Sequence, residues 1–173
     1  MNLNYICAVC QFFLSREDTL LRLPDNLSWK AAGALQPLAI AVQVARRAKL
    51  RPHATVAIIG AGPIGQLCLS MAHAYSARKT FIADIDAKRV DFAVKGRKKA
   101  PADFGATSRA TTEVWSKLPA EVKLERAAYD ATQWIQQAGL QSEGGFDIVI
   151  EASGAESAAM QGMELCKVGG TCE

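Results

Sequence analysis

The sequence contains no long hydrophobic run. Its longest weakly polar stretch, residues 31–45, is interrupted by Gln36, Pro37 and Gln43, and it is shorter than the ~20 residues that a membrane-spanning helix needs. Residues 1–5 also lack the basic start and the small-residue cleavage pattern of a secretory signal. The sequence therefore predicts no transmembrane helix, no membrane partner and a cytoplasmic location.

A strong charge of either sign is also absent. The chain has 20 Lys and Arg against 17 Asp and Glu, a formal net charge of +3, which gives no general attraction to nucleic acid or to a membrane surface. One short basic run comprises Lys95, Arg97, Lys98 and Lys99. Because the run falls in a predicted loop, we interpret it as a solvated surface, and we predict no nucleic-acid partner.

Cysteine and histidine are too few and too scattered to predict a metal site. Five cysteines are an odd number, which argues against the disulfide framework of a small secreted protein and favours free thiols. Cys7 and Cys10 have the spacing of a metal or redox pair, but no second such pair and no histidine pair completes a zinc site. His53 and His73 are predicted in a turn and in a helix. We therefore interpret Cys7 and Cys10 as incidental thiols.

The length of 173 residues suffices for one sizeable core and is too short for two ordinary domains. Half of the residues are hydrophobic and 21% are charged, as in ordinary globular proteins. We therefore expect one domain and a short additional segment.

A short apolar run, residues 55–59, leads directly into the glycine motif GAGPIG of residues 60–65. At a junction of strand and helix, Gly60 allows a tight turn, Gly62 lets the backbone approach phosphates, and Gly65 lets the helix pack closely on the strand. The free amides and the positive end of the helix dipole then face the anion. The motif predicts a pyrophosphate cradle. The alternative is a turn that serves only the packing of strand and helix.

Two residues near this motif support the prediction. Pro63 suits the first helical turn, where an amide has no intrahelical partner. Asp84 follows the second apolar run, residues 79–83, at about the ~20-residue distance expected of the acidic residue that binds the adenosine ribose hydroxyls. Its carboxylate would repel a 2′-phosphate, which predicts NAD rather than NADP. Asp84 could instead, or in addition, cap a helix over residues 87–94.

Hydrophobic periodicity predicts alternating strands and helices. The predicted strands are residues 55–59, 79–83 and 146–151, and the predicted helices are residues 64–75, 87–94, 122–138 and about 156–168, with an earlier helix starting at Pro37. This order favours an α/β fold with a doubly wound parallel sheet of the Rossmann type and right-handed crossovers.

The remaining segments give weaker signals. Residues 1–27 are predicted to be irregular, with candidate strands at residues 12–14 and 20–23, and Ser28 is predicted to cap a helix over residues 29–34. Residues 95–119 are predicted to form an inserted loop with a weak strand near residues 109–113. We expect the last helix to end at Gly169 and Gly170 with no strand after it, which leaves the sheet incomplete and residues 146–151 without a neighbouring strand on that side.

Six ordered segments together resemble the zinc-dependent medium-chain dehydrogenases, most closely the polyol branch that includes sorbitol, xylitol and arabitol dehydrogenases. The matching segments are LPDNLS at 23–28, GALQPL at 33–38, GAGPIG at 60–65, ADID at 83–86, FDIVIEASG at 146–154 and GGT at 169–171. The match runs from about residue 11 to the C-terminus, with an insertion around residues 95–103. The resemblance implies NAD-dependent oxidation of a secondary alcohol of a sugar alcohol to a ketose, with zinc polarising the substrate oxygen.

The resemblance also implies a set of cofactor-binding residues and a small-molecule partner, a polyol or a ketose. The implied residues are Gly60, Gly62, Pro63, Ile64, Gly65, Asp84, Arg89, Ser153 and Gly154. The glycine motif would hold the pyrophosphate, Asp84 the adenosine ribose, and Arg89 would lie near the adenosine. Ser153 and Gly154 would lie at the nicotinamide ribose, whereas Glu151 is interpreted as a structural carboxylate. Assembly into a homo-oligomer is left open.

The departures from the family pattern concern the metal. The family's zinc ligands lie in a Cys-Gly-Ser/Thr-Asp segment and a Gly-His-Glu segment, and this sequence contains neither. The family's Glu-Pro-Leu reads Gln36-Pro37-Leu38, and an amide replaces a carboxylate poorly as a metal ligand or proton relay. We therefore predict a remnant of the catalytic domain in residues 1–36, a truncated dinucleotide-binding domain in residues 37–173, and no catalytic or metal-binding residue.

Three functional hypotheses follow. The first is an active NAD-dependent polyol dehydrogenase, and the second is a non-catalytic dinucleotide-binding fragment of one. The third is an unrelated nucleotide-binding module, such as a methyltransferase or a ligand-sensing domain. The position of Asp84 and the EASG end of the strand at residues 146–151 argue against the third. Family resemblance favours the first hypothesis, and the residues present favour the second.

Overall fold

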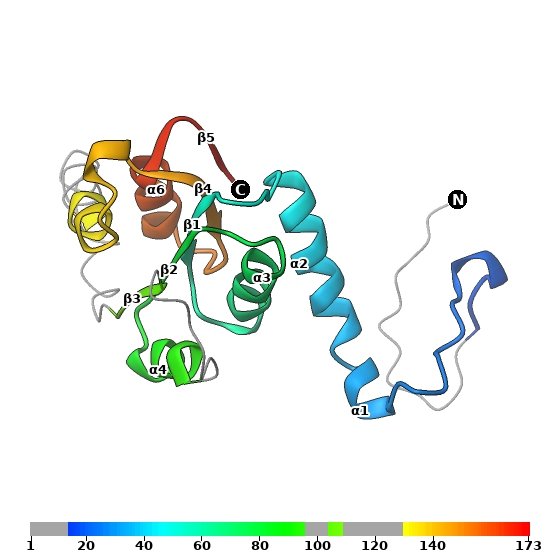
Figure 1. The fold of residues 1–173 in the computed structure, drawn as a ribbon. Coiled ribbons are helices and arrows are strands. Elements are labelled where there is room, and N and C mark those ends of the chain that lie inside the picture. The colour runs from blue at the N-terminus through cyan, green and yellow to red at the C-terminus, as the bar shows by residue number, and fades with distance from the viewer. Residues whose placement is uncertain (1–13, 96–103, 109–129) are drawn as a thin grey trace. The chain divides into compact units, whose positions relative to one another are not determined.

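The chain divides into two units, Met1–Ala34 and Leu35–Glu173. The computed structural model describes residues 14–95, 104–108 and 130–173 of them (Figure 1). In the first unit, the 3-10 helix η1 (Glu17–Thr19) precedes helix α1 (Trp29–Ala32). The Ser28 hydroxyl accepts a hydrogen bond of 3.2 Å from the amide of Ala31, so the predicted cap is confirmed.

The strand predicted over residues 20–23 is wrong. These residues carry no regular structure, and the side chains of Leu20 and Leu21 are 60% and 97% exposed. A strand needs a neighbour for its backbone hydrogen bonds, and residues 14–34, the described part of this unit, contain no strand. The candidate strand at residues 12–14 falls almost entirely outside the described residues.

The second unit is built on a five-stranded sheet in the order β3-β2-β1-β4-β5 (Figure 1). Its strands are β1 (Thr55–Ile59), β2 (Lys79–Asp84), β3 (Phe104–Ser108), β4 (Phe146–Glu151) and β5 (Cys166–Cys172). All neighbouring strands are parallel. Strand β1 is central, so its carboxyl end lies between those of β2 and β4. The predicted α/β fold with a parallel sheet is confirmed.

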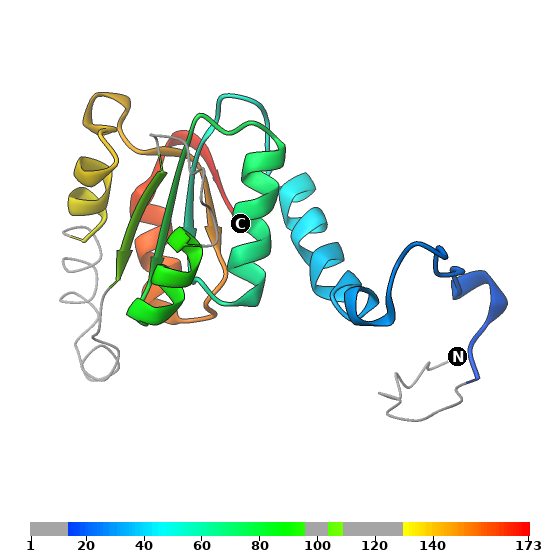
Figure 2. The same cartoon turned by 60° about the horizontal axis from the view of Figure 1, so that its bottom comes forward.

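Helices cover both faces of this sheet (Figure 2). The helices are α2 (Leu35–Arg47), α3 (Pro63–Ala74), α4 (Ala87–Lys95), residues 130–137 and α6 (Glu156–Leu165). One buried core joins α2, α3 and α4 to β1, and the other joins residues 130–137 and α6 to the opposite face. This two-sided arrangement is the doubly wound architecture. No helix among the described residues is long and apolar enough to cross a membrane.

Strand β5 corrects the prediction for the end of the chain. Helix α6 ends at Leu165 rather than near residue 168, and β5 pairs with β4 through Phe146–Cys166 and Val149–Cys172, with an irregularity between. Strand β4 is therefore paired on both sides. Glycine permits the close approach, because a Cβ at Gly170 would lie only 2.9 Å from the carbonyl oxygen of Asp147. Helical periodicity alone did not detect this change of structure.

Strand β3 lies inside the segment predicted to be a loop. It pairs with β2 from Thr80–Phe104 to Asp84–Ser108. A five-residue strand that contains glycine, alanine, threonine and serine carries almost no apolar alternation, which explains why the pattern missed it. The weak strand predicted near residues 109–113 and residues 122–129 of the helix predicted over residues 122–138 lie outside the described residues. Residues 130–137 are helical.

Candidate functional site

A pocket of about 370 Å³ lies where the carboxyl ends of β1, β2 and β4 meet. Its lining comes from the glycine turn and the start of α3, the end of β2, α4, the loop after β4, residues 130–137 and α6. Six of the predicted cofactor-binding residues line this pocket, namely Gly60, Gly62, Pro63, Asp84, Arg89 and Ser153. Ile64, Gly65 and Gly154 do not line it. Ligands of open α/β sheets bind at this edge of the sheet.

The three glycines of the turn have different surroundings. Gly60 has a φ of +104°, and a Cβ there would come within 2.9 Å of the backbone of Ala152 and Ser153. A Cβ at Gly65 would collide with the carbonyl oxygen of Gly60. A Cβ at Gly62 would meet no protein atom within 4 Å. Gly60 and Gly65 thus serve the packing of the fold, whereas Gly62 borders the pocket and has open space where a side chain would begin.

Helix α3 begins directly after this turn. Gly62 is its N-cap and provides no side-chain cap, and Pro63 is its first residue. The amide-bearing, positive end of α3 therefore adjoins the pocket without a protein side chain capping it. Ile64 packs against the core beneath α3, so its side chain is structural and only its backbone belongs to the turn.

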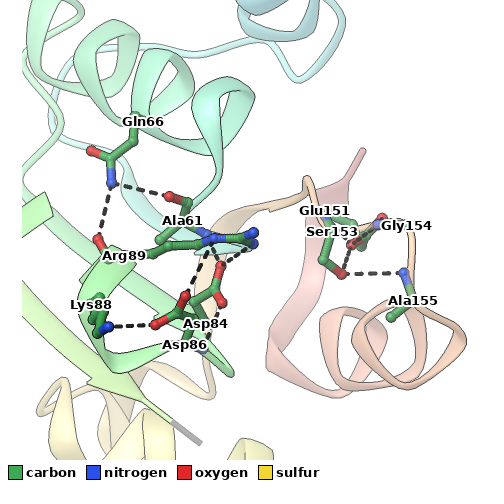
Figure 3. A network of polar contacts seen from close by, with 10 residues as sticks. All are labelled: Ala61, Gln66, Asp84, Asp86, Lys88, Arg89, Glu151, Ser153, Gly154 and Ala155. Carbon is green, nitrogen blue, oxygen red and sulfur yellow. Dashed lines mark hydrogen bonds and ion pairs between the residues drawn. The ribbon is translucent and has the colours of Figure 1, made fainter. Parts of the chain in front are cut away.

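Asp84 connects the end of β2 to the glycine turn (Figure 3). Its Oδ2 accepts a hydrogen bond of 2.6 Å from the amide of Ala61, and its Oδ1 accepts one of 2.8 Å from the amide of Asp86. The Asp84 side chain is only 5% exposed. The cap of α4 is Asp86, which accepts from the amide of Lys88 at 2.8 Å, so the alternative role predicted for Asp84 as that cap is wrong.

Arg89 and Gln66 connect the glycine turn, the end of β2 and α4 (Figure 3). The Arg89 guanidinium lies 3.8 Å from the carboxylates of both Asp84 and Asp86, and its side chain is 57% exposed. The Gln66 side-chain amide donates to the carbonyl oxygens of Ala61 and Arg89 at 3.2 and 3.4 Å. Gln66 thus joins the glycine turn to α4. Sequence reasoning missed it, because a glutamine in the first turns of a helix has no distinctive signal.

Glu151 shapes the loop that follows β4 (Figure 3). Its Oε1 accepts hydrogen bonds from the amide and the hydroxyl of Ser153, both at 2.6 Å, and from the amide of Gly154 at 2.9 Å. The φ of Gly154 is +71°, a conformation that suits glycine. The carboxylate therefore holds this loop against Gly60, which agrees with its interpretation as a structural residue.

The wall of the pocket opposite the glycine turn contains residues that the sequence did not indicate. Asp130 and Trp134 belong to the helical residues 130–137, and Ser157 and Gln161 belong to α6. The Gln161 side-chain amide donates to Oδ2 of Asp130 at 3.0 Å. The one available signal was the i, i+4 spacing of Ser157 and Gln161, two polar residues on the buried side of a helix.

The residues that the structure describes do not fit a catalytic zinc. In the described part of the chain, no group of three or more His, Cys, Asp or Glu side chains could hold a metal ion. His53 lies in a turn before β1 and His73 lies in α3. Cys7 and Cys10 lie outside the described residues. The described residues therefore form a pocket without a metal centre.

The cysteines of the second unit are free thiols of low reactivity. Burial raises the pKa of Cys68 to about 11, so its thiol stays protonated at neutral pH. Burial also raises the pKa of Cys166 and Cys172. Because the thiolate is the nucleophile and the metal ligand, none of the three is poised for either role.

Comparison with curated proteins relates the chain to reductases of a sugar. No protein-family model matches it. D-xylulose reductase A of Aspergillus niger is 33% identical over 167 residues, which cover 96% of this chain and 41% of that protein. "Probable D-xylulose reductase A" of Neosartorya fischeri is 35% identical with the same coverage. The chain thus spans about two-fifths of the length of these relatives.

Solved dehydrogenase structures share the fold. Zinc-dependent alcohol dehydrogenase 2 from Streptococcus pneumonia has a TM-score of 0.63 at 24% identity, over 88% of this chain and 37% of that one. An alcohol dehydrogenase (rspB) from Escherichia coli, complexed with NADH, has a TM-score of 0.60 at 18% identity, over 88% and 38%. A protein from Sinorhizobium meliloti bound to NADP has a TM-score of 0.54 at 24% identity, over 79% and 33%. Of these solved structures, one thus contains NADH and another contains NADP.

Proposed function

We propose that this chain, which is related to the polyol-type zinc-dependent dehydrogenases, binds NAD(H) in the pocket at the carboxyl ends of β1, β2 and β4. One observation carries the proposal: the pocket gathers the glycine turn, Asp84 and the loop after β4 around one space. The open side of Gly62 and the uncapped start of α3 suit a pyrophosphate. Asp84 is the acidic residue that suits the adenosine ribose.

The charges around Asp84 favour NAD over NADP. Two carboxylates, those of Asp84 and Asp86, share the single guanidinium of Arg89 at 3.8 Å each. The group as a whole is therefore negative, and a 2′-phosphate placed beside it would be repelled. Arg89 is not available as an unopposed phosphate ligand.

Asp84 can hold the turn and a ribose together. Its two oxygens accept one backbone amide each. A carboxylate offers about four acceptor sites, so sites for ribose hydroxyls remain. Loss of this carboxylate would remove the ribose contact and would also release the amide of Ala61 in the glycine turn.

The pocket residues do not account for the oxidation of a polyol, which is the other part of the family's reaction. Zinc, when bound in such enzymes, polarises the substrate oxygen, and this chain's own pocket residues would only bind and orient the dinucleotide. The sequence contains neither of the family's zinc-ligand segments, and the described residues provide no substitute cluster. We therefore assign the chain a non-catalytic dinucleotide-binding role, with a polyol or ketose as the substrate class that the resemblance suggests.

Calorimetric titration of the purified chain with NADH and with NADPH tests the proposal. We expect weak binding of NADH and at least roughly tenfold weaker binding of NADPH, since a buried carboxylate disfavours the added phosphate. Asp84→Ala should weaken NADH binding by roughly tenfold or more, the loss of a charge-assisted hydrogen bond.

Asp91→Asn is the matched control, because Asp91 lies on α4, its side chain is 67% exposed, and its carboxylate pairs with Lys95 at 3.1 Å. It should leave both affinities unchanged. Equal affinity for NADH and NADPH would refute the role given to Asp84, and no binding of either would refute the proposed function.

A further inference from the structure

Ala61, in the middle of the glycine turn, is held by side chains at both its amide and its carbonyl group (Figure 3). Oδ2 of Asp84, at the end of β2, accepts a hydrogen bond from its amide at 2.6 Å. The side-chain amide of Gln66, in α3, donates to its carbonyl oxygen at 3.2 Å. The two contacts act on different peptide units. Asp84 holds the unit that Ala61 shares with Gly60, and Gln66 holds the unit that it shares with Gly62.

The peptide unit between Ala61 and Gly62 adjoins the pocket, because Gly62 borders that space. In a planar trans peptide unit, the C=O and the N–H point in opposite directions. Since the carbonyl group of Ala61 points towards the Gln66 side chain, the amide of Gly62 points away from it. Among the described residues, none accepts a hydrogen bond from this amide. The N–H of Gly62 is therefore available to a ligand.

The backbone of Gly62 does not hold this peptide unit by itself. Its φ is −69°, but glycine adopts positive φ about as readily as negative φ. A half-turn of the unit would place the Ala61 carbonyl oxygen where the N–H now lies, and this oxygen would repel a phosphate. The hydrogen bond from Gln66 opposes that rotation. A second hydrogen bond, from the same side-chain amide to the carbonyl oxygen of Arg89 at 3.4 Å, fixes the Gln66 side chain against α4.

We propose that Gln66 is a positioning residue that directs the amide of Gly62 at the pyrophosphate of a bound dinucleotide. The proposal rests on the proposed function, because it concerns how the same pocket holds the phosphates. Pro63 has no N–H, so the amides of Gly62 and Ile64 are the donors nearest to the start of α3. The orientation of one of two such donors should therefore have a measurable effect on affinity.

Proton–nitrogen correlation NMR of the whole chain tests the proposal without any variant. Titration with NADH should move the amide proton resonance of Gly62 downfield, as expected of an N–H that donates to a phosphate oxygen. Adenosine, which contains the ribose and the base but no phosphate, should leave this resonance in place. If NADH moved the resonances of other pocket residues but not that of Gly62, the inference would be overturned and the proposed function would stand.

Gln66→Met retains the length of the side chain and removes its donors. We expect this variant to bind NADH roughly fivefold more weakly, which is the contribution of about one net hydrogen bond. At saturating NADH, the downfield shift of the Gly62 amide proton should also be smaller than in the wild type, because the peptide unit is free to rotate. A side chain that only joins α3 to α4 would not change this shift.

Gln43→Met on the exposed side of α2 is the matched control, since it removes the same group away from the pocket, and it should retain both the affinity and the shift. Unchanged NADH affinity in a folded Gln66→Met variant would overturn the inference, as would weaker binding with an unchanged Gly62 shift. Failure of the wild-type chain to bind NADH would overturn the proposed function and this inference with it.

Discussion

At the scale of single residues, the glycines of the turn differ in purpose. Two of them are required by the fold, and the third is expected to matter for binding. Gly60 and Gly65 have backbone atoms where a side chain would begin, whereas Gly62 faces open space. The φ of Gly62 is −69°, which any residue adopts, but that of Gly60 is +104°. Substitutions at these positions should therefore change different properties.

Gly62→Ala is expected to change stability by less than about 1 kcal/mol, the difference between glycine and alanine as an N-cap. It should nevertheless weaken NADH binding by roughly tenfold or more, because the new methyl group occupies the space of the pyrophosphate. Gly60→Ala should destabilise the fold by about 2–4 kcal/mol, through its positive φ and its overlap with the backbone after β4. Urea unfolding followed by circular dichroism, together with NADH titration, measures both effects.

Gly144→Ala is the matched control for Gly60. Gly144 also has a positive φ, +74°, but a Cβ there would meet nothing within 4 Å. It should cost only the roughly 1–2 kcal/mol of the left-handed conformation. If Gly60→Ala cost no more than Gly144→Ala, the contact with the loop after β4 would not be the limiting feature.

Site residues could be predicted from the sequence where one residue type is strongly preferred at one position of a motif. The glycines, Pro63 and Asp84 all occupy the places predicted for them, and the structure brings Gly60, Asp84 and Ser153 to one pocket. Asp130 and Gln161 were not predicted, because their contact depends on two helices that pack side by side on one face of the sheet. Such a juxtaposition has no signature in one local stretch of sequence.

At the scale of elements, Asp147 fastens three strands together at the amino end of β4. Its carboxylate accepts from the amide and hydroxyl of Thr55 on β1, at 2.8 and 2.9 Å. Lys167 on β5 lies 2.6 Å from it, and the more exposed Arg51 lies at 3.3 Å. Burial alone would raise the pKa of Asp147, but Lys167 and Thr55 outweigh it and lower this pKa to about 2.

This arrangement predicts a loss of stability in acid. The folded-state pKa of Asp147 lies below its ordinary value of 3.8, so its ionised form stabilises the fold above about pH 4, and this contribution is lost as the pH falls through about 2. The shift corresponds to about 2 kcal/mol. The stability difference between wild type and Asp147→Asn should therefore shrink by about that amount between pH 6 and the acid limit.

Urea unfolding at a series of pH values measures this difference. Asp91→Asn serves as the control, because its carboxylate is 67% exposed and should give a difference that hardly varies with pH. A constant difference between wild type and Asp147→Asn from pH 6 to pH 2 would contradict the role of Asp147 in joining the strands.

Elements were predictable where apolar periodicity is strong. Strands β1 and β4 agree with the prediction residue by residue, because each is a continuous apolar run bounded by turn-forming residues. Helix α2 begins at Leu35, two residues before the predicted start at Pro37. Strands β3 and β5 escaped prediction, since their glycine and polar residues pair through the backbone and need no apolar alternation.

At the scale of the whole molecule, the described residues combine a doubly wound fold and a pocket with no cluster of metal-ligating side chains. The described residues complete a five-stranded parallel sheet and its pocket. Hydride transfer from an alcohol also needs a group that activates the substrate oxygen, which zinc supplies in such enzymes. The sequence contains neither of the two segments that carry the zinc ligands in the family.

The purified chain is accordingly expected to show no oxidation of xylitol or sorbitol in the presence of NAD and added zinc. Absorbance of NADH at saturating polyol, with a polyol-free reaction as the control, measures this. Sustained turnover that depends on zinc and disappears with a chelator would show that the chain holds a metal site. That result would contradict the non-catalytic role but not the binding of NAD(H).

The unequal surroundings of the three glycines also bear on how this sequence can drift over generations. Mutations at Gly60 and Gly65 are removed by selection for a folded chain, whether or not a ligand is bound, because backbone atoms occupy the space beside them. Gly62 has no such protection. In descendants of this chain, retention of Gly62 would therefore indicate selection for a ligand in the pocket, whereas an intact Gly60 and Gly65 would indicate only selection for the fold.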